Sequence, residues 1–591
     1  MTPKQQKKRI LRGLSLLFTV VFCFASFISC NPGSSDFMPE DPTDSDTISD
    51  ATEVTTSEME SNTLGGGVTV LQPDPEKPEA PENPEISLYD MTSSTYDGGK
   101  LGCTKVTVLS EYTVGLDYDI YADKNSNRHI YYLYLPCRVD LSKVTFSVTH
   151  RDGSVSGPYT VNLSDDEITD NERLVATTNT YTIKAMQSNL PTVMVQIDEQ
   201  YVTIDKMNGD PNHNTFAYGD MVTTVTDEMA LANGWATRYA SADTNPDKYC
   251  SLDMRGRGNT TWNMAKKPYQ IRSENEIDLL GMGLATTYAL MANYRDAIGS
   301  RTQLALDLGQ ALELDYTSEQ RQVDFFLNGI YMGMYVIAEK VEVAPNRVEI
   351  DQTEDILFEI DQYYSESGNI GIGLTQYNSQ CRFRIHSPTE EDTVERSKQV
   401  ITEAIEALYS GDEQAFLSYF DLNSWARMYL LQIYSMNSDA YHGSLYFYYS
   451  NDDGKLHACS PWDFDWSFGG SHREDPIWWD PYLCDRSQNG ISKALLEYPS
   501  FVTEVLDVYY HEGAKEVLEL VPQWVLDYAE ENRRSFAMSE VASTVPISYY
   551  PSGGANSYDA AVYHLYTVCV DRLDWMETKM ASLAESIDYV P

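Results

Sequence analysis

The sequence lacks the cysteine patterns of metal-binding domains. It has nine cysteines in 591 residues, but no CxxC pair and no group of Cys and His at the spacing of zinc ligands, so a structural zinc site is not expected. Cys23 and Cys30 lie in the N-terminal segment, and the seven that remain (nine minus two) cannot all pair within one chain. Isolated buried thiols are the favoured interpretation, and Cys103 with Cys137 is the disulfide that we consider.

Basic residues are also scarce. The 42 Lys and Arg against 89 Asp and Glu give a formal net charge of -47, which repels the phosphates of nucleic acids and anionic lipid headgroups. No nucleic-acid partner is therefore expected. Residues 31–67 contain no Lys or Arg, and residues 72–85 are rich in Pro. Such segments bury too little apolar area to offset the entropy of the chain, so we expect residues 30–85 to form a disordered tether.

Long hydrophobic runs are missing except near the N-terminus. Five basic residues between Lys4 and Arg12 precede the apolar run from Leu14 to Ile28, which predicts a signal peptide over residues 1–29. The run is short for a span of the bilayer. Ser29-Cys30 resembles the lipobox of bacterial lipoproteins, so Cys30 is expected to carry lipid and to anchor the exported chain to the outside of the cell membrane or outer membrane. Ordinary secretion and a retained anchor helix remain the alternatives.

Residues 86–190 consist of short β-branched and aromatic runs separated by turn residues. Examples are residues 105–109, 130–135 and 144–148. This pattern predicts a small all-β module, Ig-like or similar. A spacer or an adhesion module is the default interpretation of its role.

From residue 191 to residue 591 the pattern is mixed. Asn328-Gly329 separates two apolar runs, 323–327 and 331–337, and is the strongest short-range signal for a β-hairpin. Apolar periodicity and capping residues predict helices farther on. One helix is expected to end before Gly411. The others are expected over residues 423–436, 512–536 and 557–586. Strands come first and helices later, which favours a two-lobed α+β fold.

A local reversal of charge marks residues 255–272. This segment holds five Lys and Arg residues and no Asp or Glu, and its glycines flank Arg257. Backbone N–H groups in a flexible glycine loop, with fixed positive charge behind them, can bind a chain of phosphates. The alternative is a basic surface loop that pairs with surrounding carboxylates.

Three aspartates surround a second predicted hairpin. Asp439 follows the helix over 423–436, and Asp463 and Asp465 follow the strands over 444–449 and 455–460. A hairpin brings its two ends together, so these carboxylates are expected to lie close to one another. Opposed to a cationic loop, they describe a magnesium and phosphate site. Surface carboxylates or calcium ligands are the alternatives.

Seven short motifs in this order resemble the CotH (spore-coat protein H) kinase family over roughly residues 190–590. They are Arg257-Gly258-Asn259-Thr-Thr-Trp262, Lys266-Lys267-Pro268-Tyr269, Ala292-Asn293-Tyr294-Arg-Asp296, Leu327-Asn328-Gly329-Ile-Tyr331-Met-Gly333, Ala338-Glu339-Lys340, Asn437-Ser-Asp439 and Trp462-Asp463-Phe-Asp465. The resemblance implies an atypical, two-lobed protein-kinase-like fold. It also implies an enzyme that uses ATP and a divalent metal, Mg2+ or Mn2+, to phosphorylate Ser or Thr of secreted or surface proteins.

The resemblance further implies roles for single residues. Asp439 would lie near the substrate hydroxyl, and Asp463, with Asp465 beside it, would bind metal. The loop on the nucleotide side would be formed by Arg257, Gly258 and Asn259. Phosphate would be contacted by Lys267, or alternatively by Lys266, with Glu339 holding that lysine in place.

One position departs from the family pattern. Where a protein kinase has an asparagine that binds the second metal, this chain has Ser444. A serine hydroxyl can ligate magnesium, but it is shorter than an amide and binds more weakly. A non-catalytic pseudokinase for adhesion or envelope assembly is therefore the main alternative to an active enzyme. A structural domain stabilised by calcium is a third interpretation.

Overall fold

The computed structural model describes residues 77, 79, 102–125, 129–164, 167–169, 171–178, 180–235, 249–258, 260–294, 296, 298–361, 370–374, 379–388, 391–437, 440, 441, 443–470, 490–542 and 555–591. All of these residues belong to one compact unit, Val68–Pro591. The predicted signal peptide, Cys30 and most of the predicted tether lie outside the described residues, and so do Asn259 and Asp439. None of the described helices combines the length and apolar character needed to cross a bilayer.

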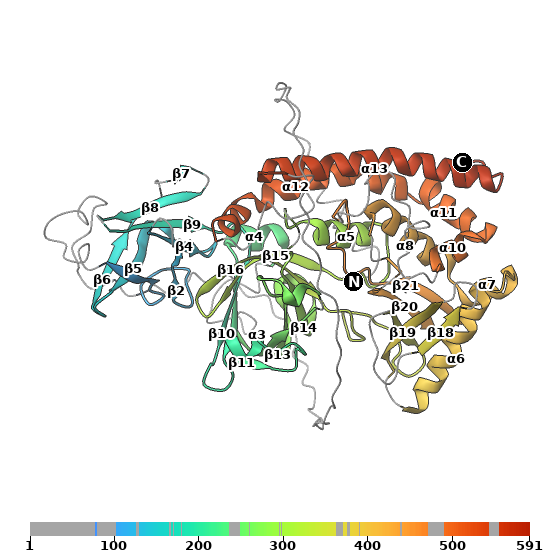
Figure 1. Cartoon of the computed structure of the whole chain (residues 1–591), viewed down its shortest axis with the longest axis horizontal. Coiled ribbons are helices and arrows are strands. Elements are labelled where there is room, and N and C mark those ends of the chain that lie inside the picture. The colour runs from blue at the N-terminus through green and yellow to red at the C-terminus, as the bar shows by residue number, and fades with distance from the viewer. Residues whose placement is uncertain are drawn as a thin grey trace, which may run out of the picture. The chain divides into compact units, whose positions relative to one another are not determined.

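Two packed β-sheets occupy residues 103–187 (Figure 1). One has the order β2-β1-β5-β6, and the other β3-β4-β9-β8-β7. Side chains of both sheets form one shared core, to which β4 contributes five successive residues and not only alternate ones. The pair β4 and β9 is parallel. The bounds are β1 Cys103–Val108, β2 Ile120–Tyr121, β3 Asp123–Asn125, β4 Ile130–Leu135, β5 Val144–His150, β6 Val155–Val161, β7 Glu167–Thr169, β8 Glu172–Thr177 and β9 Thr182–Gln187.

The disulfide considered from the sequence is not formed. Cys103 begins β1, where its Sγ donates to the carbonyl oxygen of Lys105 at 3.6 Å. Cys137 is buried elsewhere, with its Sγ 3.7 Å from the carbonyl oxygen of Thr224. The interpretation as separate buried thiols is correct for these two cysteines.

A closed barrel of seven strands follows the sandwich. Its order is β10-β11-β12-β13-β14-β16-β15, and the parallel pair of β10 with β15 closes it. The predicted hairpin at Asn328-Gly329 joins β15 to β16, with φ angles of 47° and 76° that suit this turn. The bounds are β10 Thr192–Ile197, β11 Ala217–Thr224, β12 Tyr249–Gly256, β13 Tyr269–Asp278, β14 Leu284–Met291, β15 Gln320–Leu327 and β16 Ile330–Glu339.

The remaining strands form a five-stranded sheet, called the second sheet from here on, and the other elements are helices. The sheet has the order β18-β19-β17-β20-β21, and α8 is buried over most of its length against the other helices. The sheet strands are β17 Ile356–Ile360, β18 Ile370–Leu374, β19 Ser379–Ser387, β20 Leu445–Ser450 and β21 Lys455–Cys459. The helices are α3 Ile204–Asn208, α4 Asp227–Asn233, α5 Arg301–Ala311, α6 Glu391–Leu408, α7 Glu413–Tyr419, α8 Leu422–Ser435, α10 Ile491–Leu496, α11 Pro499–His511, α12 Ala514–Val541 and α13 Tyr558–Ser586. The chain is thus a mixture of α and β structure, as the sequence predicts.

Asp324 of β15 joins the sandwich, the barrel and α12. Its buried carboxylate accepts hydrogen bonds from Ser188 after β9, from Tyr331 of β16 and from Ser535 of α12. The core of the sandwich continues onto Phe326 of the barrel, and α12 contacts both β9 and β16. Figure 1 shows α12 and α13 side by side. The β-module therefore packs against the barrel and α12, and its role as a spacer or an adhesion module stays a prediction.

His457 gives the stability of the second sheet a dependence on pH. Its ring stacks on Tyr448 at 4.9 Å, and its nitrogens lie 3.5 Å from Asp421 and 3.0 Å from Asp453. Burial lowers the pKa of His457, but the hydrogen bonds to the two carboxylates outweigh this, so the pKa is raised above its ordinary value of 6.5. The stabilisation is therefore complete below pH 6.5 and is lost as the pH rises through the folded-state pKa.

We expect His457→Phe, which keeps a ring on Tyr448, to lower the free energy of unfolding by about 1 kcal/mol at pH 5.5 and by much less at pH 9. Urea denaturation of both proteins at the two pH values measures this. Equal losses at both pH values would show that the charge of the imidazolium does not contribute and that uncharged contacts of the ring nitrogens account for the loss.

Candidate functional site

The loop after β12 has a fixed shape that depends on two glycines. Trp262 lies in a 3-10 turn, Thr260–Asn263, and packs so closely on Gly256 that a Cβ there would come within 2.4 Å of its ring. Gly258 has a φ of 85°, in the left-handed region that favours glycine. The indole Nε1 of Trp262 donates to the carbonyl oxygen of Asp210 at 3.0 Å. Arg257 therefore projects from a loop that is held on both sides.

The two lysines of this loop have different environments. Lys267 is half-buried, and its Nζ donates to the carbonyl oxygen of Trp262 and lies 4.7 Å from the centre of that ring. Lys266 is only 4% exposed, donates to the carbonyl oxygen of Met334 and lies 4.4 Å from the ring centre of Tyr335. An ammonium enclosed in this way is not available to phosphate from solvent. Lys266 is thus a structural residue of the barrel, in place of the phosphate contact predicted as one possibility.

Asp463 and Ser444 meet at the open end of the hairpin formed by β20 and β21. The Oγ of Ser444 donates to Oδ2 of Asp463 at 3.3 Å. The Nδ2 of Asn437 donates to the carbonyl oxygen of Asp463 at 3.4 Å, and the amide of Phe468 donates to the carbonyl oxygen of Ser435 at the end of α8. The hairpin thus brings the end of α8 and the segment after β21 together, as predicted. Asp463 is exposed, and Asp465 is half-buried two residues farther on.

Arg257 of the cationic loop approaches Asp463. The guanidinium of Arg257 lies 5.5 Å from the ring centre of Trp462, next to Asp463. Burial lowers the pKa of Arg257, and the negative charge of Asp463 acts in the opposite direction. The basic segment and the aspartate after the hairpin are far apart in sequence, so this approach is a property of the fold.

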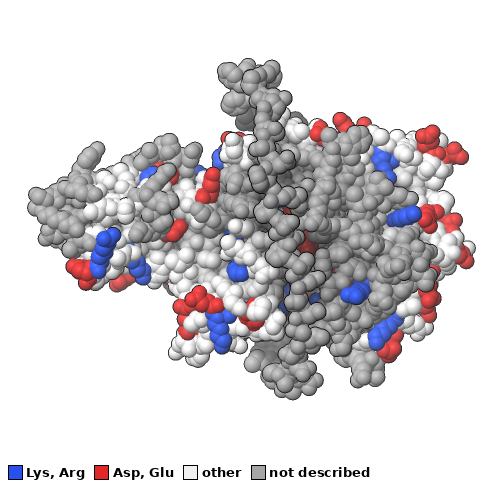
Figure 2. All heavy atoms as spheres, in the orientation of Figure 1, with Lys and Arg blue, Asp and Glu red and all other residues white. Residues whose placement is uncertain are grey.

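Arg272 of the basic segment pairs with Asp253 at 2.6 Å, but the cations closer to the loop do not pair in this way. Arg255, Arg257 and Lys267 form no ion pair with any carboxylate in the described part of the chain, although the protein is strongly acidic. On the face shown in Figure 2, by contrast, many Lys and Arg side chains lie beside Asp or Glu. The loop therefore keeps positive charge that the neighbouring carboxylates do not neutralise.

Strained backbone is concentrated around Asp463. Several residues there other than glycine have φ in the left-handed region. They are Tyr441 (60°), Ser444 (56°), Ser460 (44°), Asp463 (65°) and Phe468 (48°). Such conformations cost free energy and persist where the surrounding structure enforces them, which is common at functional sites.

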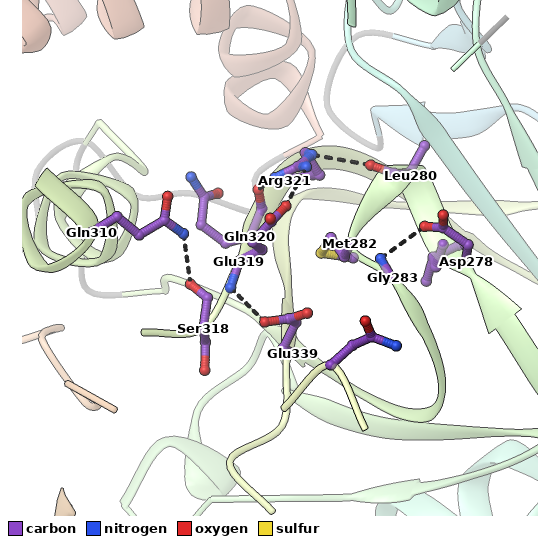
Figure 3. Close-up of polar contacts among 12 residues, drawn as sticks. Asp278, Leu280, Met282, Gly283, Gln310, Ser318, Glu319, Gln320, Arg321 and Glu339 are labelled. Atoms are coloured by element: carbon purple, nitrogen blue, oxygen red, sulfur yellow. Dashed lines mark hydrogen bonds and ion pairs between the residues drawn. The ribbon is translucent and has the colours of Figure 1, made fainter. Parts of the chain in front are cut away.

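Glu339 has a different partner from the one predicted. Its carboxylate pairs with Arg347 and accepts the amide of Glu319 at 2.8 Å, as Figure 3 shows for Glu319. Burial raises the pKa of Glu339 to about 8, against the opposing charge of Arg347. The chain returns after β16 and places Arg347 over Tyr288, so Glu339 is already paired with a buried cation. It does not hold Lys267, whose Nζ bonds to Trp262.

An apolar cluster lies next to Arg257 and Asp463. It joins the outer sides of β14 and β16 to the second sheet, and sequence reasoning did not identify most of its members. Its buried members include Ala289, Val336, Ala338, Val341, Leu357, Tyr446 and Trp462. The alternation of apolar residues in β14 and β16 gives no signal that their outer sides are covered.

The oxygen atoms at the site are of the kind that a hard cation binds. Asp463 supplies a carboxylate and Ser444 a hydroxyl oxygen 3.3 Å away, and magnesium prefers such ligands. Within the described ranges, no group of three or more His, Cys, Asp or Glu residues could hold a metal ion. Asp439, the other carboxylate predicted for this place, lies outside those ranges, as does Asn259 of the loop.

The stretch that contains this site matches a known family. The model of the CotH kinase proteins matches residues 254–575, which is more than half of the chain. The chain belongs to the CotH kinase protein family. Every candidate residue of this CotH chain from Arg257 to Asp465 lies inside the match, and Cys30 lies before it.

One similar solved structure is that of CtkA, a proinflammatory kinase of Helicobacter pylori. The two chains are 12% identical. The match covers 54% of this CotH chain and 95% of CtkA, with a TM-score of 0.23. No curated protein matches the chain.

Proposed function

We propose that this protein is an atypical kinase that transfers the γ-phosphate of ATP to Ser or Thr of secreted or envelope proteins. The observation that carries the proposal is the approach of Arg257 to Asp463 and Ser444. Positive charge and cation-binding oxygens side by side are what a phosphate chain with a divalent metal requires. Membership of the CotH kinase family supports the same reaction.

Each part of the site has a role in this proposal. Arg257 and Lys267 bind phosphate oxygens, and the loop that carries them is already ordered, so little reorganisation is needed when the nucleotide binds. Asp463 and Ser444 hold Mg2+ or Mn2+, with Asp465 close by in sequence. The metal, when bound, neutralises charge on the phosphates. The apolar cluster that includes Tyr446 and Trp462 offers a surface for the base.

Asp439 is the proposed residue at the acceptor hydroxyl. It lies outside the described residues, two positions after Asn437, whose side chain bonds to the backbone of Asp463. A carboxylate there orients the hydroxyl and accepts its proton as the phosphoryl group is transferred. The motif Asn437-Ser-Asp439 supports this assignment.

We further propose that the enzyme acts outside the cell as a lipoprotein. The signal-peptide pattern of residues 1–29 and the cysteine at position 30 support export followed by lipidation of Cys30. The acidic, Pro-rich segment over 30–85 would then hold the folded part away from the membrane.

Phosphate transfer can be tested on residues 31–591, the mature chain without the lipidated Cys30. With Mg2+ or Mn2+ and labelled ATP, we expect incorporation of phosphate into the protein, lost in Asp439→Asn because the acceptor hydroxyl loses its base. Nucleotide at a hundred times its dissociation constant should also stabilise the fold by about 2.7 kcal/mol. A wild-type protein that neither binds nucleotide nor incorporates phosphate with either metal would refute the proposal.

Ser444 supports a second candidate, a pseudokinase with a role in adhesion or envelope assembly. Its hydroxyl is already bonded to Asp463, and it is shorter than the asparagine of active kinases. This candidate predicts binding of ATP without transfer. Stabilisation by calcium alone, with no effect of nucleotide, would instead favour a calcium-dependent structural domain.

A further inference from the structure

Lys266 places a charged group inside the barrel without a carboxylate partner. No ion pair joins it to any carboxylate that the structure describes. Its ammonium donates to the carbonyl oxygen of Met334 and faces the ring of Tyr335 at 4.4 Å. Burial lowers the pKa of Lys266 to about 7, with the charge of Asp324 acting in the opposite direction. An apolar side chain would fill the same space without this cost of desolvation. Filling the barrel alone therefore does not explain why a lysine bonded to Met334 occupies this position.

Two neighbouring residues of β16 hold Lys266 and Lys267 from within. While the carbonyl oxygen of Met334 accepts from Lys266, the buried Oη of Tyr335 donates to the carbonyl oxygen of Lys267 at 2.9 Å. The peptide of Met334 is itself fixed, because its amide donates to Oγ of Ser539 in α12 at 2.8 Å. The side chain of Lys266 and the backbone of Lys267 are thus both attached to β16, which is itself bonded to α12.

These attachments continue into the site. Lys267 bonds to the carbonyl oxygen of Trp262, and Trp262 packs on Gly256 next to Arg257. The amide of Arg257 donates to the carbonyl oxygen of Pro268 at 3.3 Å. A displacement of residues 266 and 267 would therefore move both Lys267 and Arg257.

We infer that Lys266 and Tyr335 are positioning residues that hold Lys267 and Arg257 ready for phosphate from inside the barrel. Neither residue touches the substrate in this arrangement, since Lys266 bonds to Met334 and Tyr335 lies in the barrel core. The inference rests on the proposed function. It assigns the Lys-Lys pair two separate tasks, with Lys266 as the anchor and Lys267 as the phosphate contact.

The test compares Lys266→Met, Lys266→Gln and Tyr335→Phe with wild type in the mature chain. Calorimetry with Mg·ATP should show binding weakened by about tenfold in Lys266→Met, the effect of roughly one lost hydrogen bond. Lys266→Gln retains an N–H donor for Met334 and should recover part of this loss. Tyr335→Phe should weaken binding several-fold through Lys267 alone. KM for ATP should rise in Lys266→Met while kcat changes little.

Lys184→Met is the matched control. Lys184 also lies over a tyrosine ring, Tyr132 at 5.9 Å, and pairs with Glu172, but it is in the sandwich and has no contact with the loop. It should leave ATP binding unchanged. Hydrogen exchange of residues 257–267 supplies a readout without nucleotide, and should become faster in Lys266→Met and Tyr335→Phe but not in Lys184→Met.

The outcomes separate the two proposals. Unchanged ATP binding and unchanged exchange in folded Lys266→Met, whatever its melting temperature, would overturn the inference. If Lys266→Met does not fold, the same two measurements on Tyr335→Phe decide it. A wild-type chain without affinity for ATP would refute the proposed function, and the exchange of the loop would still show whether the two residues anchor it.

Discussion

Asp463→Ala is expected to lower the rate of phosphate transfer by about a hundredfold or more. Asp463 is the exposed carboxylate that lies beside both Arg257 and Ser444, so its loss removes the proposed metal ligand and the negative charge that faces the loop. Initial rates with Mg2+ and with Mn2+ over a range of metal concentrations measure the effect. Saturating metal should recover little of the lost rate if the carboxylate holds the ion directly.

Asp453→Ala is a suitable control for this variant. Asp453 is a carboxylate in the turn of the same hairpin, at the opposite end from Asp463, and its contact is with His457. Transfer rates should remain within about twofold of wild type at pH 8, because surface ion pairs contribute little. Wild-type rates in Asp463→Ala would contradict the placement of the metal. If Asp463 binds the metal, Ser444→Asn should raise the affinity of the enzyme for metal. If Asp463→Ala has wild-type rates, no effect of Ser444→Asn on metal affinity is expected.

Arg301→Met is expected to cost about 3–5 kcal/mol of stability, as is usual when one member of a buried ion pair is removed. Arg301 and Asp296 pair with side-chain exposures of 1% and 2% at the start of α5. Asp296 also accepts the amide of Arg301 at 2.7 Å and that of Ile298 at 3.2 Å, so it closes the turn before the helix. Guanidinium denaturation, followed by tryptophan fluorescence and circular dichroism, measures the loss.

The exposed pair of Lys398 with Glu395 on α6 gives the comparison. Lys398→Met should change stability by less than about 1 kcal/mol, because water screens that pair. A loss in Arg301→Met no larger than this would show that Asp296 is satisfied by the two backbone amides alone. The ion pair with Arg301 would then not explain the aspartate at position 296.

Local patterns predicted much of this fold, because the signals lie within a few residues of the structures that they specify. Asn328-Gly329 supplied the positive φ angles of a tight turn, and the hairpin forms there. Apolar spacing predicted α8 and α13 within a few residues of their bounds. The reversal of charge at residues 255–272 also pointed to a site, and the structure brings Arg257 of that segment next to Asp463.

Partners that are distant in sequence were beyond such reasoning. Lys266 and Lys267 are adjacent and chemically identical, and only the packing of β16 shows that one is enclosed. Glu339 was assigned to a lysine by analogy. It pairs instead with Arg347, whose guanidinium is already desolvated. Closure of the barrel depends on β10 meeting β15, which no local pattern encodes.

The closed barrel has a practical consequence for anyone who would trim the chain to its family match. A fragment that starts at residue 254 loses β10, β11 and most of β12. These are three of the seven strands of the barrel. The edges of β13 and β15 would then present unpaired N–H and C=O groups to other molecules. Such edges recruit further strands and lead to aggregation. Expression should therefore include the sandwich, whose Ser188 is bonded to β15.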